Sequence, residues 1–211
     1  MQTATVIRPA RGGALPWVLL ALVLLAWGTS VVFLAEAYVL RQGPGQPPLR
    51  LVASIAIPVV IGVLCWRLVP AVRRWTDSWN LALLVGLQTF RVMGIVFLFV
   101  WWLGQLPTLF AWIAALGDIA VGIMALPAIV AVAQRQDGWQ ARVRRLTYAG
   151  LADFAVVLLL GVLSAEGRVL HLAIEPTSAA MQVMPMVMIP GFLVPIFILL
   201  LLLQYQRSLT R

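Results

Sequence analysis

The sequence contains no lysine, a single cysteine, a single histidine and only seven acidic residues among 211. One cysteine excludes an intramolecular disulfide and a cluster of thiolate ligands around a metal. One histidine excludes a haem held by two histidines of the same chain. The absence of lysine is more typical of a coding bias than of a physical requirement, so it excludes nothing.

The sequence also lacks any polar stretch long enough to bury a core of its own. It is 63% hydrophobic and 10% charged, with a mean hydropathy of +1.00. This composition is typical of polytopic membrane proteins and lies outside the range of soluble domains. We therefore expect residues 1–211 to form one integral membrane domain, with the lipid bilayer as its surroundings.

Apolar stretches of about 20 residues, the length of helix that crosses a hydrocarbon layer of ~30 Å, occur six times. The predicted fold class is therefore all-α, a polytopic transmembrane bundle of six helices. The first stretch exceeds the ~7–15 apolar residues of a signal peptide, so we expect an uncleaved anchor helix. The helices are predicted near residues 16–40, 51–70, 80–103, 108–133, 147–165 and 186–205.

Fourteen of the fifteen arginines are placed at the ends of these predicted helices, and their distribution between the two sides is uneven. Basic residues resist translocation, so the side that holds more of them is predicted to be cytoplasmic. With the N-terminus inside, eleven arginines fall on the cytoplasmic side and only Arg41, Arg50 and Arg168 on the other. Both termini are then cytoplasmic. The net charge of +8 is explained by this topology, so a nucleic-acid partner is not expected.

One permanent charge, Arg91, lies inside the third predicted helix, in "QTFRVMGIVFLFVWWLG". The connection "GQLP" at 104–107 is so short that the third and fourth helices must be antiparallel neighbours. At a rise of about 1.5 Å per residue, Arg91 and Asp118 lie roughly 22 and 19 Å from this turn. Their side chains are therefore expected to meet. We predict a bidentate Arg91–Asp118 contact, with Gln88 one turn away.

A second acid, Asp153, shares a stripe with small residues in the fifth predicted helix and is expected to face the bundle interior. An unpaired charge at mid-membrane costs about 2.5–3.5 kcal/mol on insertion scales. If Arg91 serves one carboxylate fully, the other is expected to take up a proton, because burial disfavours the charged form. The sequence leaves open whether Asp153 joins the pair. The candidate polar core comprises Gln88, Arg91, Asp118 and Asp153.

Other candidate sites are weaker. His171 and Glu175 are spaced like two metal ligands on a helix, but Pro176 ends any helix there and two ligands are too few. We interpret this segment as an exposed interfacial loop. The methionines between 181 and 188 are interpreted as flexible apolar filler rather than copper ligands. No phosphate-binding glycine loop, metalloprotease helix or nucleophile elbow is present, so no catalytic, cofactor or metal site is predicted.

The spacing "Q..R..G..FL.....G.LP..FA.....GD...G..A", from Gln88 to Ala125, resembles a family of small bacterial integral membrane proteins that carry no assigned activity. The segment "MIPGFLVPIFILLLLLQ" is similar to that family's C-terminal "IP.F.VP" segment. A histidine is expected near Gln204 in that family, and this chain has none there, so any role of that histidine does not carry over. The resemblance implies a bacterial inner-membrane protein and supplies no activity.

Two functions from different classes fit these observations. The first is a small inner-membrane protein that binds or transports a small solute or proton through the polar core. Asp118 or Asp153 would be its titrating group and Arg91 the counter-charge. The second is a non-catalytic membrane subunit that binds a partner protein or a second copy of itself, with a purely structural ion pair. An intramembrane enzyme ranks last, because no catalytic spacing is present.

Overall fold

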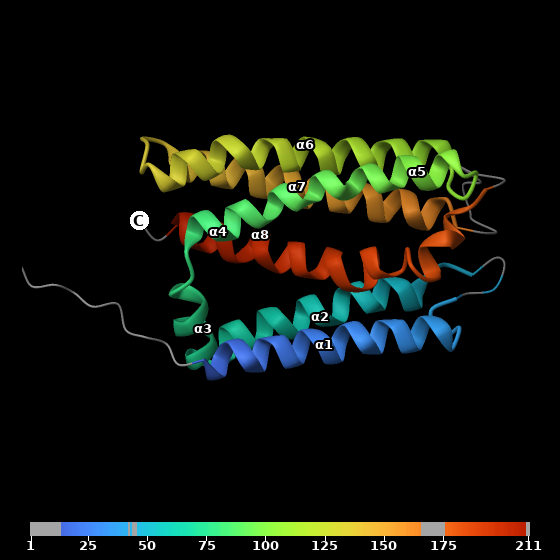
Figure 1. Ribbon diagram of the computed structural model, residues 1–211, viewed down its shortest axis with the longest axis horizontal. Helices are drawn as coiled ribbons and strands as arrows, with labels where there is room; N and C mark the ends of the chain where they lie inside the picture. Colours follow the sequence, from blue (N-terminus) through green and yellow to red (C-terminus); the bar gives the residue numbers. More distant parts are fainter. Residues whose placement is uncertain (1–13, 42, 44–45, 166–175, 210–211) are drawn as a thin grey trace, which may run out of the picture.

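The computed structural model describes residues 14–41, 43, 46–165 and 176–209, and the regular structure within these ranges is helical. Six helices are long and apolar enough to cross a membrane, which confirms the predicted all-α transmembrane bundle. Figure 1 shows these helices side by side with their axes roughly parallel. The bundle therefore has two ends, and the depth of a residue is its distance from them.

The helices follow one another up and down the bundle. The third span is built from three consecutive segments and the sixth from two. In chain order the elements are α1 (Leu15–Glu36), α2 (Leu49–Leu68), α3 (Pro70–Asp77), α4 (Leu81–Gly86), η1 (Leu87–Ile95), α5 (Val96–Trp102), α6 (Thr108–Ala133), α7 (Trp139–Leu163), η2 (Ser178–Gln182), η3 (Ile189–Leu193) and α8 (Val194–Leu209).

The two ends of the bundle differ in charge. One end holds α3, the start of α7 and the end of α8, and most of the described arginines lie there; we call it the arginine-rich end. Figure 1 shows it on the left, where α3 lies. The other end, where α1 ends and α2 begins, is called the opposite end.

The middle of the third span winds as a 3₁₀ helix, η1, rather than as the continuous α-helix that hydropathy predicts. Runs of 3₁₀ helix longer than three or four residues are uncommon. Here the winding accompanies a close approach to α6. A Cβ atom on Gly122 would lie 2.9 Å from the backbone nitrogen of Val92 and 3.3 Å from the carbonyl oxygen of Thr89. The two backbones therefore touch.

The fifth span begins at Trp139, about two turns before the predicted start at Thr147. The sequence prediction was wrong here because Arg142, Arg144 and Arg145 lower the local hydropathy. The apolar side of these turns is nevertheless buried: Val143 is 0% and Leu146 1% exposed. An amphipathic turn with one apolar stripe extends the helix beyond the apolar stretch itself.

The eight-residue helix α3 was not predicted, because it is too short and too polar to be recognised as a span. Pro70 starts it, as proline favours the first turn of a helix. Figure 1 shows α3 at the arginine-rich end, between α2 and α4. An amphipathic helix in this position is typical of a membrane interface.

The first two spans lie at the edge of the bundle, and Figure 1 shows them together below the other helices. In α1 only Val31 and Ala35 are buried, and in α2 only Ile55. The third, fourth, fifth and sixth spans carry most of the core. Its largest apolar clusters lie on either side of the middle of the bundle, one around Phe97 and Phe110 and one around residues 121–125.

Candidate functional site

Arg91 lies in the middle of the bundle, between these two apolar clusters, and is 2% exposed. Its Nε donates a hydrogen bond to Oδ1 of Asp118 at 2.7 Å, and its Nη2 donates to Oδ2 of Asp153. Its Nη1 lies 3.4 Å from the carbonyl oxygen of Gly150. The face of the guanidinium stacks on Phe154, with Cζ 3.9 Å from the ring centroid. Every nitrogen of the Arg91 guanidinium therefore has a hydrogen-bond partner.

The pairing differs in one respect from the predicted contact. A bidentate Arg91–Asp118 bond was expected, but the guanidinium divides its donors between Asp118 on α6 and Asp153 on α7. The short 104–107 turn made Asp118 predictable. Asp153 lies on α7, which only residues 134–138 separate from α6. The predicted start of this span at residue 147 made the connection look long, so the depth of Asp153 was not counted from it. We call Arg91, Asp118 and Asp153 the Arg91 triad.

Three glycines make room for the Arg91 triad, one on each of its helices. A Cβ atom on Gly94 of η1 would overlap Asp118 of α6, and one on Gly117 of α6 would overlap Asp153 of α7. A Cβ atom on Gly150 of α7 would lie 2.9 Å from Nη1 of Arg91 on η1. Each helix therefore supplies one charge and one glycine, and each charge rests on the glycine of a neighbour. Small residues permit such close approach between membrane helices.

The charges of the Arg91 triad do not balance. One guanidinium faces two carboxylates, so one negative charge is left over whenever both acids are ionised. The carboxylates are also not fully sealed: the side chain of Asp118 is 16% exposed and that of Asp153 9%, against 0% for Arg91. A buried charge without a full partner takes up a proton, a counter-ion or water. The site can therefore accept a proton or a cation.

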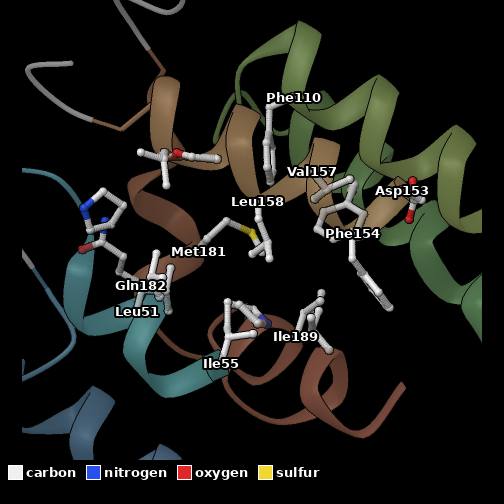
Figure 2. Close-up of a pocket in the computed structure, with 18 of the residues that line it drawn as sticks. Leu51, Ile55, Phe110, Asp153, Phe154, Val157, Leu158, Met181, Gln182 and Ile189 are labelled. Carbon is white, nitrogen blue, oxygen red and sulfur yellow. Dashed lines mark hydrogen bonds between the residues drawn. The ribbon is translucent and has the colours of Figure 1, made fainter. Parts of the chain in front are cut away.

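A cavity of about 60 Å³ lies beside the two acids and runs toward the opposite end of the bundle. At roughly 15 Å³ per water, it has room for about four water molecules. Its walls are mainly apolar. Figure 2 shows Asp153 at one side and Gln182 at the other, with Met181 and Leu158 between them. Pro48 and Ser178, which also line it, lie near the opposite end.

A layer of buried amide and hydroxyl groups lies one turn from the Arg91 triad, on the side of the arginine-rich end. Gln88 is three residues before Arg91, and Thr147 three residues before Gly150. Gln204 lies one turn beyond Leu201, whose side chain packs beside Gly150. Gln88 and Gln204 are both 0% exposed. We call Gln88, Thr147 and Gln204 the amide layer.

The amide layer is not satisfied by the described residues. Gln204 donates through Nε2 to Oγ1 of Thr147 at 3.1 Å, and Thr147 donates to the carbonyl oxygen of Val143. Within the described ranges, Oε1 of Gln204 and both polar atoms of the Gln88 amide have no partner. A buried polar group without a partner costs about 1–3 kcal/mol. The layer is therefore built to receive water or a polar ligand.

Sequence reasoning found Gln88 but missed Thr147 and Gln204. An isolated glutamine at the end of the leucine run "LLLLLQ" is indistinguishable from an interfacial residue by hydropathy alone. Gln204 shares the buried face of α8 with Leu200 and Leu201, but residues 199–203 are all leucine, so the sequence carries no signal that marks this face.

Of the other candidates from the sequence, Met181 lines the cavity. His171 and Glu175 lie outside the described residues. Cys65 is exposed. Among the described residues, no group of three or more histidine, cysteine or acidic side chains is placed to hold a metal ion. Pro190 lies in η3, a π-helical turn that lines the cavity, as expected where proline removes a backbone donor.

A family model described as a domain of unknown function, DUF8737, matches residues 47–205. This range covers most of the chain and contains every residue of the Arg91 triad, the cavity and the amide layer. No curated protein and no solved structure matches the chain.

Proposed function

The chain belongs to the DUF8737 family, and from the geometry of the Arg91 triad we propose that it binds a small solute or moves protons through its interior. The observation that carries the proposal is the charge imbalance: two carboxylates share one guanidinium beside a cavity large enough for water. Intramembrane acids that line a wettable space are the usual components of proton relays.

In this proposal Asp153 and Asp118 take up and release the proton, and Arg91 holds the counter-charge. A proton that enters through the cavity neutralises one carboxylate. The guanidinium then pairs fully with the other, so the site alternates between a net charge of −1, when both acids are ionised, and neutrality, when one acid is protonated. The unsatisfied Gln88 amide supports the next step, since it can bind a water that receives the proton from the Arg91 triad.

In this proposal the path of the proton is blocked between the amide layer and the arginine-rich end. The apolar cluster that contains Val85, Val121, Ala125, Val143 and Leu146 lies between the amide layer and the arginine-rich end. Transfer of a proton across the bundle therefore requires the side chains of this cluster to move apart. We propose that movement occurs in the third and sixth spans, where η1 and η3 interrupt the regular α-helix.

For the cellular setting, we propose a bacterial inner-membrane protein with both termini in the cytoplasm. The uneven arginine distribution supports this orientation: in the described residues, only Arg41 and Arg50 lie at the opposite end. The arginine-rich end would then face the cytoplasm, and the cavity would open toward the outer side.

A second function is favoured by a different observation. Every nitrogen of Arg91 is bonded and its face is stacked on Phe154, as a purely structural clamp would require. In this alternative the chain is a non-catalytic subunit. The exposed apolar residues of α1 and α2 would then contact a partner protein or a second copy of the chain.

The two functions are separated by proton flux into liposomes that contain the purified chain and a pH-sensitive dye, driven by a potassium diffusion potential. We expect flux above that of empty liposomes, reduced at least tenfold by Asp153→Asn and by Asp118→Asn. The matched control is Asp137→Asn, which removes an exposed acid in the turn before α7 and should leave flux unchanged. Flux equal to that of empty liposomes, or unaffected by both triad variants, would contradict the proposal.

A further inference from the structure

A second hollow, separate from the Arg91 triad, lies at the arginine-rich end and has a volume of about 590 Å³. The ends of five spans, the second to the sixth, and the short helix α3 contribute to its lining. This volume falls within the roughly 300–1,000 Å³ of small-molecule sites. We call it the arginine hollow. None of its residues belongs to the site described above.

The charge of the arginine hollow is positive. Arg73, Arg135 and Arg207 line it, against one acid, Asp77. Two of the guanidinium groups are positioned by neighbours: Nη1 of Arg207 donates to the carbonyl oxygen of Trp79 at 2.8 Å, and Cζ of Arg73 lies 5.3 Å above the ring of Trp66. Such an arrangement favours an anion with several acceptor oxygens.

Arg135 is held in an unusual backbone conformation. It follows the last turn of α6 with φ of 52°, in the left-handed region that residues other than glycine rarely adopt. The end of α6 explains this conformation, because the N–H groups of Arg135 and Gln136 donate to the carbonyl oxygens of Val132 and Ala131, as in a Schellman motif. Arg135 also lies on the wall of the arginine hollow.

Two tryptophans at the wall of the arginine hollow have indole N–H groups without a hydrogen-bond partner among the described residues. They are Trp66 and Trp79, and both indole nitrogens are buried. An indole N–H is a donor only, so the missing partner must be an acceptor. Buried donors are almost always satisfied, by a ligand or water where protein provides no acceptor.

The position of the arginine hollow identifies the anion. Trp79 packs against Trp17 and Trp75, with ring centroids 5.4 and 4.9 Å away, in a tryptophan cluster at the end of the membrane spans. Tryptophans gather at the level of lipid headgroups. A phosphate group, from a lipid headgroup or free in solution, offers several oxygens to arginines and indoles at this depth.

We propose that the arginine hollow binds a negatively charged phosphate group, supplied by the headgroup of an anionic phospholipid or by a free phosphate. The arginines neutralise the phosphate, and the indoles of Trp66 and Trp79 donate to its oxygens. Asp77 disfavours a second negative charge on the ligand. This site does not depend on the function proposed for the Arg91 triad.

The test uses the full chain, purified and stripped of lipid in an uncharged detergent, with binding followed by thermal stabilisation. The probes are short-chain phosphatidylglycerol, short-chain phosphatidylcholine and inorganic phosphate. We expect phosphatidylglycerol to bind at least tenfold more tightly than phosphatidylcholine. Stabilisation by phosphatidylglycerol alone assigns a lipid site, and stabilisation by inorganic phosphate as well assigns a site for free phosphate. Equal binding of the two lipids, or no stabilisation by any probe, overturns the proposal.

Two sets of variants locate the binding. Arg73→Gln combined with Arg135→Gln should weaken binding at least tenfold, whereas Arg74→Gln, a neighbour on α3 outside the lining, should leave it unchanged. Trp66→Phe removes one donor without charge and should weaken binding severalfold. Binding that falls equally with Arg74→Gln would indicate unspecific attraction and contradict the site. Gel filtration identifies variants that fail to fold. If the double variant of Arg73 and Arg135 fails to fold, the folded Trp66→Phe variant is decisive, and unchanged phosphatidylglycerol binding by it contradicts the proposal.

Discussion

Replacing Arg91 by glutamine removes the one positive charge between two buried carboxylates. Breaking a buried ion pair from one side costs about 3–5 kcal/mol, because the remaining charge stays buried without a partner. Here two carboxylates remain, so we expect Arg91→Gln to lower the free energy of unfolding by about 3–5 kcal/mol. The lost stacking on Phe154 adds to this cost.

The acids should respond differently. Asp153→Asn or Asp118→Asn removes the surplus negative charge and leaves the guanidinium with one full partner. Each variant exchanges a charge-assisted hydrogen bond for a neutral one, which is worth about 1 kcal/mol less. We therefore expect each to cost about 1 kcal/mol, well below the cost of Arg91→Gln. Combining Arg91→Gln with both asparagines should recover most of the lost stability, since no charge remains.

Unfolding in mixed micelles measures these differences, with an SDS titration followed by tryptophan fluorescence. Asp137→Asn is the control for the loss of an exposed acid. The reasoning is refuted if Asp118→Asn costs as much as Arg91→Gln while Asp153→Asn costs nothing. That pattern would show a single ion pair, with Asp153 outside it. It is also refuted if the triple variant is less stable than Arg91→Gln alone.

Three further predictions follow from the packing. Gly94→Ala places a Cβ atom where Asp118 lies and should lower the free energy of unfolding by about 1–3 kcal/mol in the same SDS titration. Gly86→Ala is the control, because its Cβ would meet Ile129 at an ordinary contact distance of 3.7 Å, and it should be neutral or stabilising. Gln88→Leu removes the unsatisfied amide and should keep stability within ~1 kcal/mol while lowering proton flux. Met181→Phe narrows the cavity and should lower flux at a stability cost below ~1.5 kcal/mol; unchanged flux would show that the cavity is not on the route.

The number and length of the spans could be predicted because hydropathy over about 20 residues reports directly on the ability to cross a bilayer. The type of helix within each span could not be predicted. The 3₁₀ segment 87–95 and the π turn 189–193 arise from contacts with α6 and from Pro190, which a hydropathy window averages away. The start of α7 was missed for a related reason, since its first turns are amphipathic rather than apolar.

Within the candidate site, predictability followed the length of the connections. Arg91 and Asp118 are separated by one tight turn, so their depths could be counted from a common origin. Asp153 is tied to α6 by residues 134–138, but the predicted start of its span at 147 hid this short connection. Gln204 follows a longer connection, so counting along the sequence gives no depth for it relative to Arg91. The orientation in the membrane and the role of the four predicted polar residues stay predictions.

The three glycines explain why the Arg91 triad has two acids rather than one. A device that only fixes helix register needs a single ion pair, and an additional buried carboxylate adds a desolvation penalty of several kcal/mol without a new counter-charge. Yet Gly117 has no side chain at the point where Asp153 lies, so the packing between α6 and α7 makes room for this second acid. Asp153 also lines the cavity. A surplus acid for which the packing makes room, placed beside a cavity, is the observation that supports the proposal of proton uptake, and a register device would not require it.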